Sequence, residues 1–425
     1  MKRSTKTIRL ATVAAAGTLV LAACGGGDGG GGGDDAGPAT SKADGTLTVG
    51  ALLPQTGSLA YLGPPEFAGV DLAIEDINKA GGVLGKDVKG AKADSGDTAA
   101  GIAPAETDKL LKAGSDVIVG AASSDVTETV IDKILSAGVV QFSPANTTTK
   151  FDLGKYAKPD LYFRTAPSDI LQGAVLSNLL IEDGRKNVGI LARQDPYGET
   201  LAEEAKKGIE GAGSKVSATV FYGEKAKDFD TQVAEIADSK PDAVLLIAFD
   251  ETTAIVPQLI SAGIGPKDLP TYFVDGNTAN YGEGDAKTLP DGTLEGVKGT
   301  APGAETSGDF KKRLATIDPG LKDFLYAGES YDATIVSALA AIAADSDAGS
   351  DLAKEIINVT TGGEKCTEFK QCADLLADGS DIDYDGISGP IELGDTGSPT
   401  AASVGIYEYD DKNKISPVKF ISGQI

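Results

Sequence analysis

The segment 116–149 constrains the fold more than any other part of the sequence. Its β-branched run 117–119 does not alternate between apolar and polar residues, which is typical of a strand buried on both faces of a parallel sheet. Small residues follow, and the run 123–125 (Ser-Ser-Asp) consists of residue types preferred at the start of a helix. A strand signal at 139–142 and a polar loop at 143–147 repeat the pattern. The segment therefore predicts two neighbouring parallel strands, each followed by a polar loop.

These two loops predict a ligand site. In an open parallel sheet, ligands bind beyond the carboxyl ends of the strands. The bare backbone amides of a helix start, together with the hydroxyls of Ser123 and Ser124, suit a carboxylate or another small anion. Each loop alone also fits an ordinary turn whose polar residues only cap a helix. The prediction of a site therefore depends on the rest of the chain.

The alternation of strand and helix signals continues along the chain and predicts an α/β protein. Two successive series of about five strands each predict two doubly wound lobes. The C-terminal part differs, because Gly394–Gly397 is typical of a hairpin turn between short strands in the segment 386–409. The expected strands lie at 46–53, 117–120, 139–142, 188–192, 216–222, 243–249 and 271–275. The expected helices lie at 65–80, 103–113, 126–135, 168–182, 198–211, 229–239, 253–262, 309–314 and 331–344.

Residues 1–24 form a predicted targeting segment. Basic residues precede an apolar stretch at 10–21 that is too short to anchor stably across a bilayer. The sequence Leu-Ala-Ala-Cys-Gly at 21–25 resembles a bacterial lipobox, which implies a lipid on the Cys24 sulfur and tethering outside the cytoplasmic membrane. The alternative is a cleaved signal peptide with an incidental cysteine. Residues 25–45 begin with a Gly- and Asp-rich run and predict a flexible tether.

Composition excludes several classes of function. The 425 residues carry a net charge of -25, which argues against nucleic acid or an anionic membrane surface as a partner. The chain has no histidine, the usual general base and metal ligand, so we expect no catalytic triad, no metal site and no cofactor. With Cys24 assigned to lipid, Cys366 and Cys372 remain as a pair and predict a disulfide.

A set of short motifs, in order along the mature chain, resembles the branched-chain amino-acid-binding proteins of ABC importers. The resemblance implies a type I periplasmic-binding fold, in which two doubly wound three-layer lobes are joined by three crossing strands and close on a ligand. We expect lobe 1 at 46–166 and 301–403, and lobe 2 at 167–300 and 404–425. The motifs are Gln55-Thr56-Gly57-Ser58-Leu59-Ala60, Glu66-Phe67-Ala68-Gly69, Asp76-Ile77-Asn78, Gly81-Gly82, Ser143-Pro144-Ala145, Tyr197-Gly198, Tyr331-Asp332-Ala333 and Ser388-Gly389-Pro390-Ile391.

The resemblance also implies the roles of the ligand-binding residues. The ligand carboxylate would be held at Ser123 and Ser124, with Ser124 favoured. The ammonium would contact the backbone of Asn146, the hydroxyl of Thr147 and the carboxylate of Asp275. Aromatic walls would come from Tyr197 and Phe249, and either Tyr61 or Leu62 would contact the ligand side chain. For Asp275 the alternative is a solvated acid before a glycine turn.

The leading hypothesis is a non-enzymatic, monomeric lipoprotein on the extracytoplasmic face that captures an aliphatic amino acid for an ABC permease. A receptor for urea or a short amide is the alternative if Asp275 does not reach the ligand. An anchored hydrolase using Ser124 lacks a Gly-x-Ser-x-Gly elbow and a histidine base. The acidic run 381–392 matches the liganding pattern of an EF-hand. Because Pro390 interrupts this run, we expect an acidic surface turn rather than a calcium loop.

Overall fold

The computed structural model describes residues 41, 43–156, 160–285 and 288–424. The predicted targeting segment, Cys24 and most of the predicted tether lie outside these residues. Within the described ranges, no helix has both the length and the apolar character needed to cross a membrane.

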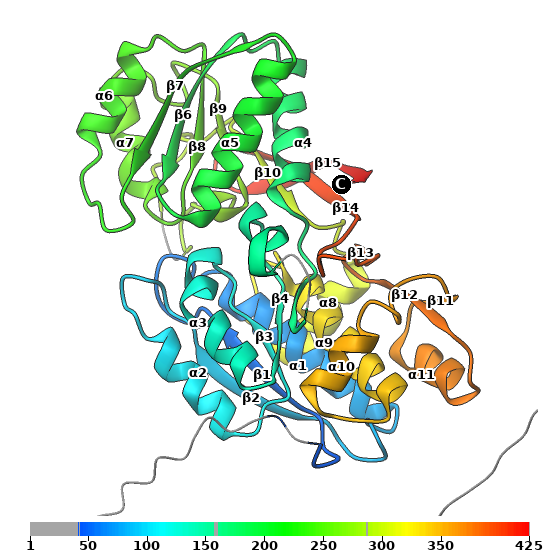
Figure 1. The fold of residues 1–425 in the computed structure, drawn as a ribbon. Coiled ribbons are helices and arrows are strands. Elements are labelled where there is room, and N and C mark those ends of the chain that lie inside the picture. Colours follow the sequence, from blue (N-terminus) through cyan, green and yellow to red (C-terminus); the bar gives the residue numbers. More distant parts are fainter. Residues whose placement is uncertain (1–40, 42, 157–159, 286–287, 425) are drawn as a thin grey trace, which may run out of the picture. The chain divides into compact units, whose positions relative to one another are not determined.

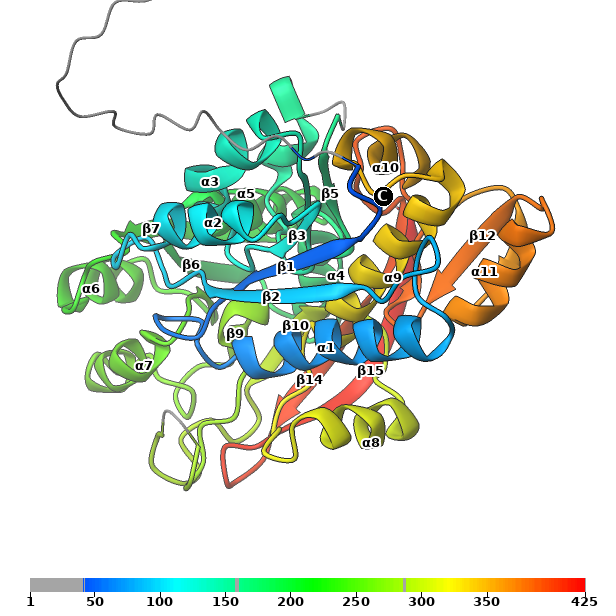
Figure 2. The same ribbon diagram turned by 90° about the horizontal axis from the view of Figure 1, so that it is seen from below.

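The first lobe is built on a five-stranded parallel sheet, with strand order β2-β1-β3-β4-β5. Val117 and Val119 pack toward α1 and α9, whereas Ile118 packs toward α2 and α3. The uniformly apolar run of β3 is thus explained by helices on both faces. Figure 2 shows α2 and α3 on one side of β1 and β2, with α1 on the other. The elements are β1 (Thr48–Leu53), α1 (Gly63–Lys79), β2 (Lys89–Asp94), α2 (Ala103–Lys112), β3 (Val117–Gly120), α3 (Ser124–Ser136), β4 (Val140–Ser143), η1 (Thr149–Asp152), η2 (Gly154–Tyr156), β5 (Tyr162–Arg164), α8 (Gly308–Ile317), α9 (Ala327–Ala344) and α10 (Gly349–Glu355).

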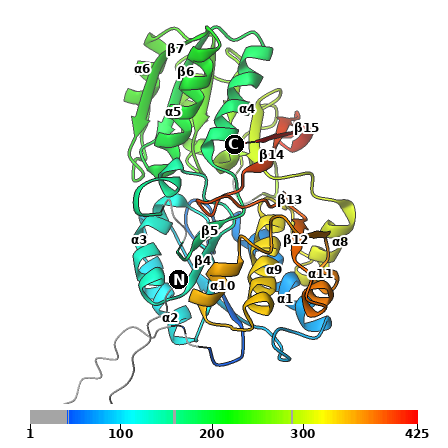
Figure 3. The ribbon, with the colours of Figure 1, turned by 45° about the vertical axis from the view of Figure 1, so that its right-hand side comes forward.

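The second lobe contains a seven-stranded sheet, with strand order β15-β14-β10-β9-β8-β6-β7. Neighbouring strands from β10 to β7 run parallel, and β14 and β15 add two antiparallel strands. Helices α4 and α5 cover one face, and α6 and α7 cover the other. Figure 1 shows the α4 to β9 part of this lobe in green and β14 and β15 in red, and Figure 3 also shows β14 and β15 with this lobe. The elements are α4 (Asp169–Glu182), β6 (Asn187–Arg193), α5 (Pro196–Gly211), β7 (Lys215–Tyr222), α6 (Asp230–Asp238), β8 (Ala243–Ile247), α7 (Thr252–Ser261), β9 (Thr271–Phe273), η3 (Asp275–Asn277), β10 (Lys298–Pro302), β14 (Ala401–Tyr409) and β15 (Ile415–Gln424).

The chain crosses between the lobes from β5 to α4, from β10 to α8, and again before β14. The crossing segments are joined to one another by backbone hydrogen bonds. The backbone N–H of Arg164 donates to the carbonyl of Gly397 at 3.0 Å, and that of Gly303 donates to the carbonyl of Ser403 at 2.8 Å. The two-lobed α/β fold with three crossings is therefore confirmed. The exact lobe boundaries stay a prediction.

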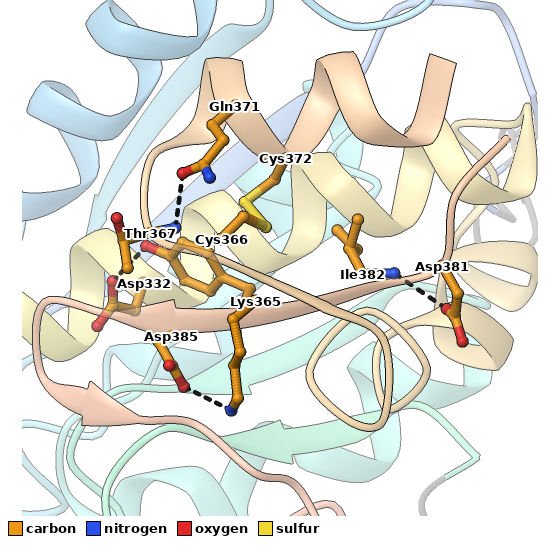
Figure 4. The surroundings of a disulfide bond; sticks show 10 residues. Asp332, Lys365, Cys366, Thr367, Gln371, Cys372, Asp381, Ile382 and Asp385 are labelled. Carbon is orange, nitrogen blue, oxygen red and sulfur yellow. Dashed lines mark hydrogen bonds and ion pairs between the residues drawn. A yellow bond between two sulfur atoms is a disulfide. The ribbon is translucent and has the colours of Figure 1, made fainter. Parts of the chain in front are cut away.

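A small third sheet carries the predicted disulfide, which joins Cys366 of β11 to Cys372 of α11. Beside the disulfide, the ammonium of Lys365 lies 2.9 Å from Asp383 and 3.0 Å from Asp385. Figure 4 shows the disulfide and the pair of Lys365 with Asp385. Two of the acidic residues that match an EF-hand pattern, Asp383 and Asp385, are therefore paired with a lysine. They lie in strand β12, so this part of the run is a strand and not the expected surface turn. The elements are β11 (Glu364–Cys366), α11 (Phe369–Ala377), β12 (Ile382–Gly386) and β13 (Gly389–Pro390).

Three local features differ from the sequence prediction. The sequence gives no strand signal for β2, whose small and charged residues are mostly exposed at the edge of the sheet. The strand expected to reach Asp275 ends at Phe273, because the side chain of Asn277 accepts a bond from Val274 N–H at 2.9 Å and closes the 3₁₀ turn η3. The Gly394–Gly397 turn forms, but its flanks make only one bridge, between Leu393 and Pro399.

Candidate functional site between the lobes

Asp275 lies at the centre of the candidate site, in the turn that follows β9. Its side chain is almost completely buried, with 5% of the residue exposed. One carboxylate oxygen accepts hydrogen bonds from Tyr197 Oη at 2.7 Å and Gln172 Nε2 at 2.9 Å, and the other accepts one from Tyr326 Oη at 2.7 Å. Burial raises the pKa of Asp275, and the hydrogen bonds oppose this rise.

The charge of Asp275 has no cationic partner within the described residues, where none of the ion pairs formed by lysine or arginine includes it. A buried carboxylate is stabilised by hydrogen bonds or by a paired charge, and here only hydrogen bonds are present. The site is therefore electrostatically suited to a small cation such as an ammonium group.

Tyr197 and Phe249 form an aromatic wall beside this carboxylate. Their ring centres are 5.5 Å apart and the planes are inclined by 18°, a stacked arrangement. Behind the wall, the guanidinium of Arg193 lies 3.8 Å from the centre of the Phe249 ring. Arg193 is itself held by ion pairs with Asp195 and Glu251. The aromatic rings are therefore fixed from the second lobe by a cation–π contact.

The opposite wall comes from the two polar loops of the first lobe. Ser123 is the N-cap residue of α3 and Ser124 is the first helical residue. The two loops are joined, because Asn146 Nδ2 donates to the carbonyls of Ala121 at 3.1 Å and Ala122 at 2.8 Å. The predicted meeting of the loops at one edge of the sheet is thus present. It places the amino end of α3 toward the second lobe.

The space between the walls is a small cavity of about 20 Å³. We call it the Asp275 cavity. Six of the predicted site residues line it, and four of the remaining lining residues have small or aliphatic side chains. The predicted lining residues are Leu62, Ser123, Ser124, Tyr197, Phe249 and Asp275; the others are Leu59, Ala122, Ala145, Gly276 and Tyr326.

Three predicted site residues lie outside the wall of this cavity. The backbone carbonyl of Asn146 accepts a hydrogen bond from Arg164 Nη1 at 3.2 Å. Thr147 is fully buried; burial raises the pKa of Asp169 to about 7, and Thr147 is one of the groups that oppose this rise. The hydroxyl of Tyr61 donates to the backbone carbonyl of Asp275 at 3.0 Å, so Tyr61 contacts the site from behind. The ligand contacts predicted for these three residues stay predictions.

The sequence prediction missed two donors to Asp275. Gln172 is a buried amide in the first turn of α4, a helix in which Asp169 and Ser177 are also buried among apolar residues. A polar residue on the buried face of this helix was the available signal. Tyr326 precedes α9 in a left-handed backbone conformation, with φ of +60°. The residue pattern does not indicate that its side chain reaches Asp275. Both donors are placed by tertiary packing.

A cluster of carboxylates lies beside the site, where the two lobes meet. Oxygens of Asp125, Asp195 and Glu224 lie within 4.8 Å of one another. The hydroxyl of Thr98 donates to Asp125 at 3.1 Å and also to Glu224. Burial raises the pKa of Asp195 to about 6, and the nearby charge of Asp125 adds to this rise. The cluster therefore places like charges across the interface between the lobes.

Two α/β lobes with three crossings and a small cavity between the lobes are typical of the bilobed solute-binding proteins that close around a small molecule. The sequence profile described as "Periplasmic binding protein" matches residues 46–413. The chain thus belongs to the periplasmic binding protein family.

Comparisons with individual proteins agree with this family. The chain is 31% identical over 260 residues to the leucine-, isoleucine-, valine-, threonine-, and alanine-binding protein of Pseudomonas aeruginosa, covering 59% of this chain and 68% of that protein. Its fold is similar to that of a branched-chain amino acid transporter substrate binding protein from Streptococcus pneumoniae in complex with isoleucine (TM-score 0.69, 19% identity, covering 89% of this chain and 100% of that one). It is also similar to an ABC transporter solute binding protein from R. palustris in complex with benzoate (TM-score 0.66, 19% identity, covering 90% and 98%).

Proposed function

We propose that this protein captures a branched-chain or other aliphatic amino acid between its lobes and delivers it to an ABC permease. The buried carboxylate of Asp275 carries the proposal, because its only partners among the described residues are uncharged donors. An ammonium group supplies the missing charge. An uncharged ligand leaves the carboxylate unpaired in a desolvated site, which is costly. Capture requires tighter binding to the closed than to the open state, and no catalysis.

The proposed binding mode assigns each end of the amino acid to one lobe. The α-carboxylate contacts Ser124, Ser123 and the backbone amides at the amino end of α3, where the helix dipole favours an anion. The ammonium contacts Asp275 in the second lobe. Loop 145–147 supplies the Asn146 carbonyl and the Thr147 hydroxyl, once the loop has adjusted. A zwitterion therefore bridges the lobes and stabilises their closure.

A receptor for urea or a short amide is the second candidate, and the size of the Asp275 cavity favours it. A volume of about 20 Å³ leaves room for little more than a water molecule. Against it stands the charge of Asp275, since urea and acetamide carry no cation. The two candidates therefore make opposite predictions for ligand charge.

The proposal includes a lipid anchor on Cys24, cleavage before this residue, and action as a monomer on the extracytoplasmic face of the membrane. The lipobox-like sequence at 21–25 supports the anchor. Labelling with a radioactive fatty acid tests it directly. We expect label in the wild-type protein and none in Cys24→Ala. Equal labelling of the two would contradict the anchor.

A thermal-shift screen tests the proposed ligand class. The protein, unfolded and refolded to remove bound ligand, is heated with leucine, isoleucine, valine, alanine, urea or acetamide. A ligand at about 100 times its Kd adds roughly 2.7 kcal/mol, which raises Tm by several degrees. We expect a shift with the aliphatic amino acids. A shift with acetamide or urea, and none with any zwitterion, would assign the site to amides.

A further inference from the structure

A second and larger cavity lies directly behind Tyr61. Its volume is about 210 Å³ and its walls are mostly apolar. The first lobe contributes the start of α1 and the loop before α9, and the second lobe contributes the loop after η3. We call it the Tyr61 cavity. The residues that the argument uses are Tyr61, Pro65, Asp250, Ala279, Tyr281 and Leu321.

The Tyr61 cavity and the Asp275 cavity are adjacent. Phe249 lines one and Asp250, the next residue, lines the other. Leu62 likewise lines the Asp275 cavity, whereas its neighbour Tyr61 lines the Tyr61 cavity. The hydroxyl of Tyr61 donates to the backbone carbonyl of Asp275 at 3.0 Å. The side chain of Tyr61 therefore lies between the two spaces.

The two cavities differ in the size of the chemical group that they can accommodate. A water molecule needs at least about 10–15 Å³, so the Asp275 cavity has room for the head group only after its walls adjust. An apolar cavity of about 150 Å³ binds benzene, so about 210 Å³ accommodates a branched aliphatic or an aromatic side chain. The space for a large side chain thus lies on the far side of Tyr61.

The charged residues around the Tyr61 cavity are engaged with other partners. Asp285 forms an ion pair with Lys414. The ammonium of Lys322 donates to the carbonyl of Gly284 at 2.6 Å. The carboxylate of Asp323 accepts bonds from the backbone N–H groups of Phe324 and Leu325 at 2.7 and 3.0 Å. The remaining surface suits an uncharged, apolar group.

We propose that Tyr61 is a movable partition, and that the Tyr61 cavity receives the side chain of an amino acid whose head group is held at Asp275. This inference rests on the proposed function and specifies its substrate class: amino acids with large apolar side chains, phenylalanine included, bind more tightly than alanine. Tyr61 is half-buried, and its hydroxyl donates a hydrogen bond to the backbone carbonyl of Asp275 in the second lobe. Displacing the ring breaks that bond and joins the two cavities.

The test measures the Kd values of alanine, leucine and phenylalanine by titration calorimetry. In the wild-type protein we expect phenylalanine to bind 10- to 100-fold more tightly than alanine, the effect of burying its ring. Ala279→Trp and Leu321→Trp each fill the Tyr61 cavity from a different lobe, and each should reduce this ratio at least tenfold. Ala212→Trp, at the exposed end of α5, is the matched control and should leave the ratio unchanged.

Tyr61→Phe removes the hydroxyl and keeps the ring. We expect it to increase phenylalanine affinity severalfold, because the partition then moves without losing its hydrogen bond.

An unchanged phenylalanine-to-alanine ratio in both filled variants, with leucine still bound, would overturn the role of the Tyr61 cavity and leave the proposed function standing. If Ala279→Trp does not fold, Leu321→Trp decides alone, since Leu321 lies in a partly exposed loop. Binding of no amino acid by the wild-type protein would overturn both proposals.

Discussion

Replacing Asp275 by asparagine isolates the charge on which the amino-acid assignment depends. The substitution keeps the shape of the side chain but removes the negative charge from a position that is 5% exposed. Two charges 4 Å apart attract by about 4 kcal/mol at an effective dielectric constant of 20. Removing one partner of a buried, hydrogen-bonded pair costs about 2–5 kcal/mol. We expect a loss of about 3 kcal/mol, which raises the Kd of leucine more than 100-fold.

The assay compares leucine with 4-methylpentanoate, which is leucine without its ammonium group, by titration calorimetry. The wild-type protein should prefer leucine strongly, and Asp275→Asn should bind the two ligands within about threefold of each other. Comparing two ligands in two proteins forms a double-mutant-type cycle. The cycle separates the coupling between the ligand ammonium and the Asp275 carboxylate from any general damage to the site. Asp183→Asn, which removes a carboxylate paired with Lys298 elsewhere in the second lobe, is the matched control.

Stability measurements separate loss of binding from loss of folding. The ligand-free variant should unfold within about 1 kcal/mol of the wild type, because losing hydrogen bonds and relieving the burial of a charge oppose each other. If Asp275→Asn retains its preference for leucine over 4-methylpentanoate, the ammonium does not contact Asp275. The amino-acid binding mode would then be wrong.

Three further predictions concern pH, the disulfide and Tyr326. Burial raises the pKa of Glu329 to about 8, so the folded protein keeps a proton that the unfolded chain releases above pH 4.5. The free energy of unfolding should therefore fall as pH rises from 4.5 to 8. In urea titrations, Glu329→Gln should reduce this slope by up to about 1.4 kcal/mol per pH unit. Replacing Cys366 and Cys372 by serine should lower the free energy of unfolding by about 2 kcal/mol without changing leucine affinity, and an affected Kd would contradict their purely structural role. Tyr326→Phe removes a hydrogen-bond donor to Asp275 and should raise the pKa of that carboxyl further. As the pH is lowered, the variant should therefore lose leucine affinity at a higher pH than the wild type does. Identical pH profiles by calorimetry would count against this contact.

The features that the sequence predicted correctly are those fixed by local patterning. Apolar runs without alternation identified β3, β6 and β8, because strands covered on both faces need apolar residues throughout. The helix-start residues at 123–125 placed the amino end of α3 within two residues. Both polar loops were identified because the carboxyl ends of parallel strands share one edge of the sheet.

The features that the sequence did not predict depend on contacts between distant segments. Tyr326 and Gln172 meet at Asp275 only after α9 and α4 have packed on different sheets. Tyr61 and Leu62 are neighbours in the chain, yet they line different cavities. Local pattern does not determine which of two adjacent side chains points into a site when the backbone there is a loop. Packing of the second lobe decides it.

The hydrogen bonds of Asp275 link ligand charge to lobe closure. Tyr197 and Gln172 belong to the second lobe with Asp275, whereas Tyr326 precedes α9 of the first lobe. The bond from Tyr326 therefore crosses between the lobes and is made only when they are close. Opening exposes the carboxylate to water, which stabilises its charge and favours the open form without ligand. In the proposed binding mode, an ammonium would reverse this preference by pairing with the charge inside the closed cavity, and the ligand would close the protein through its differential affinity for the two states.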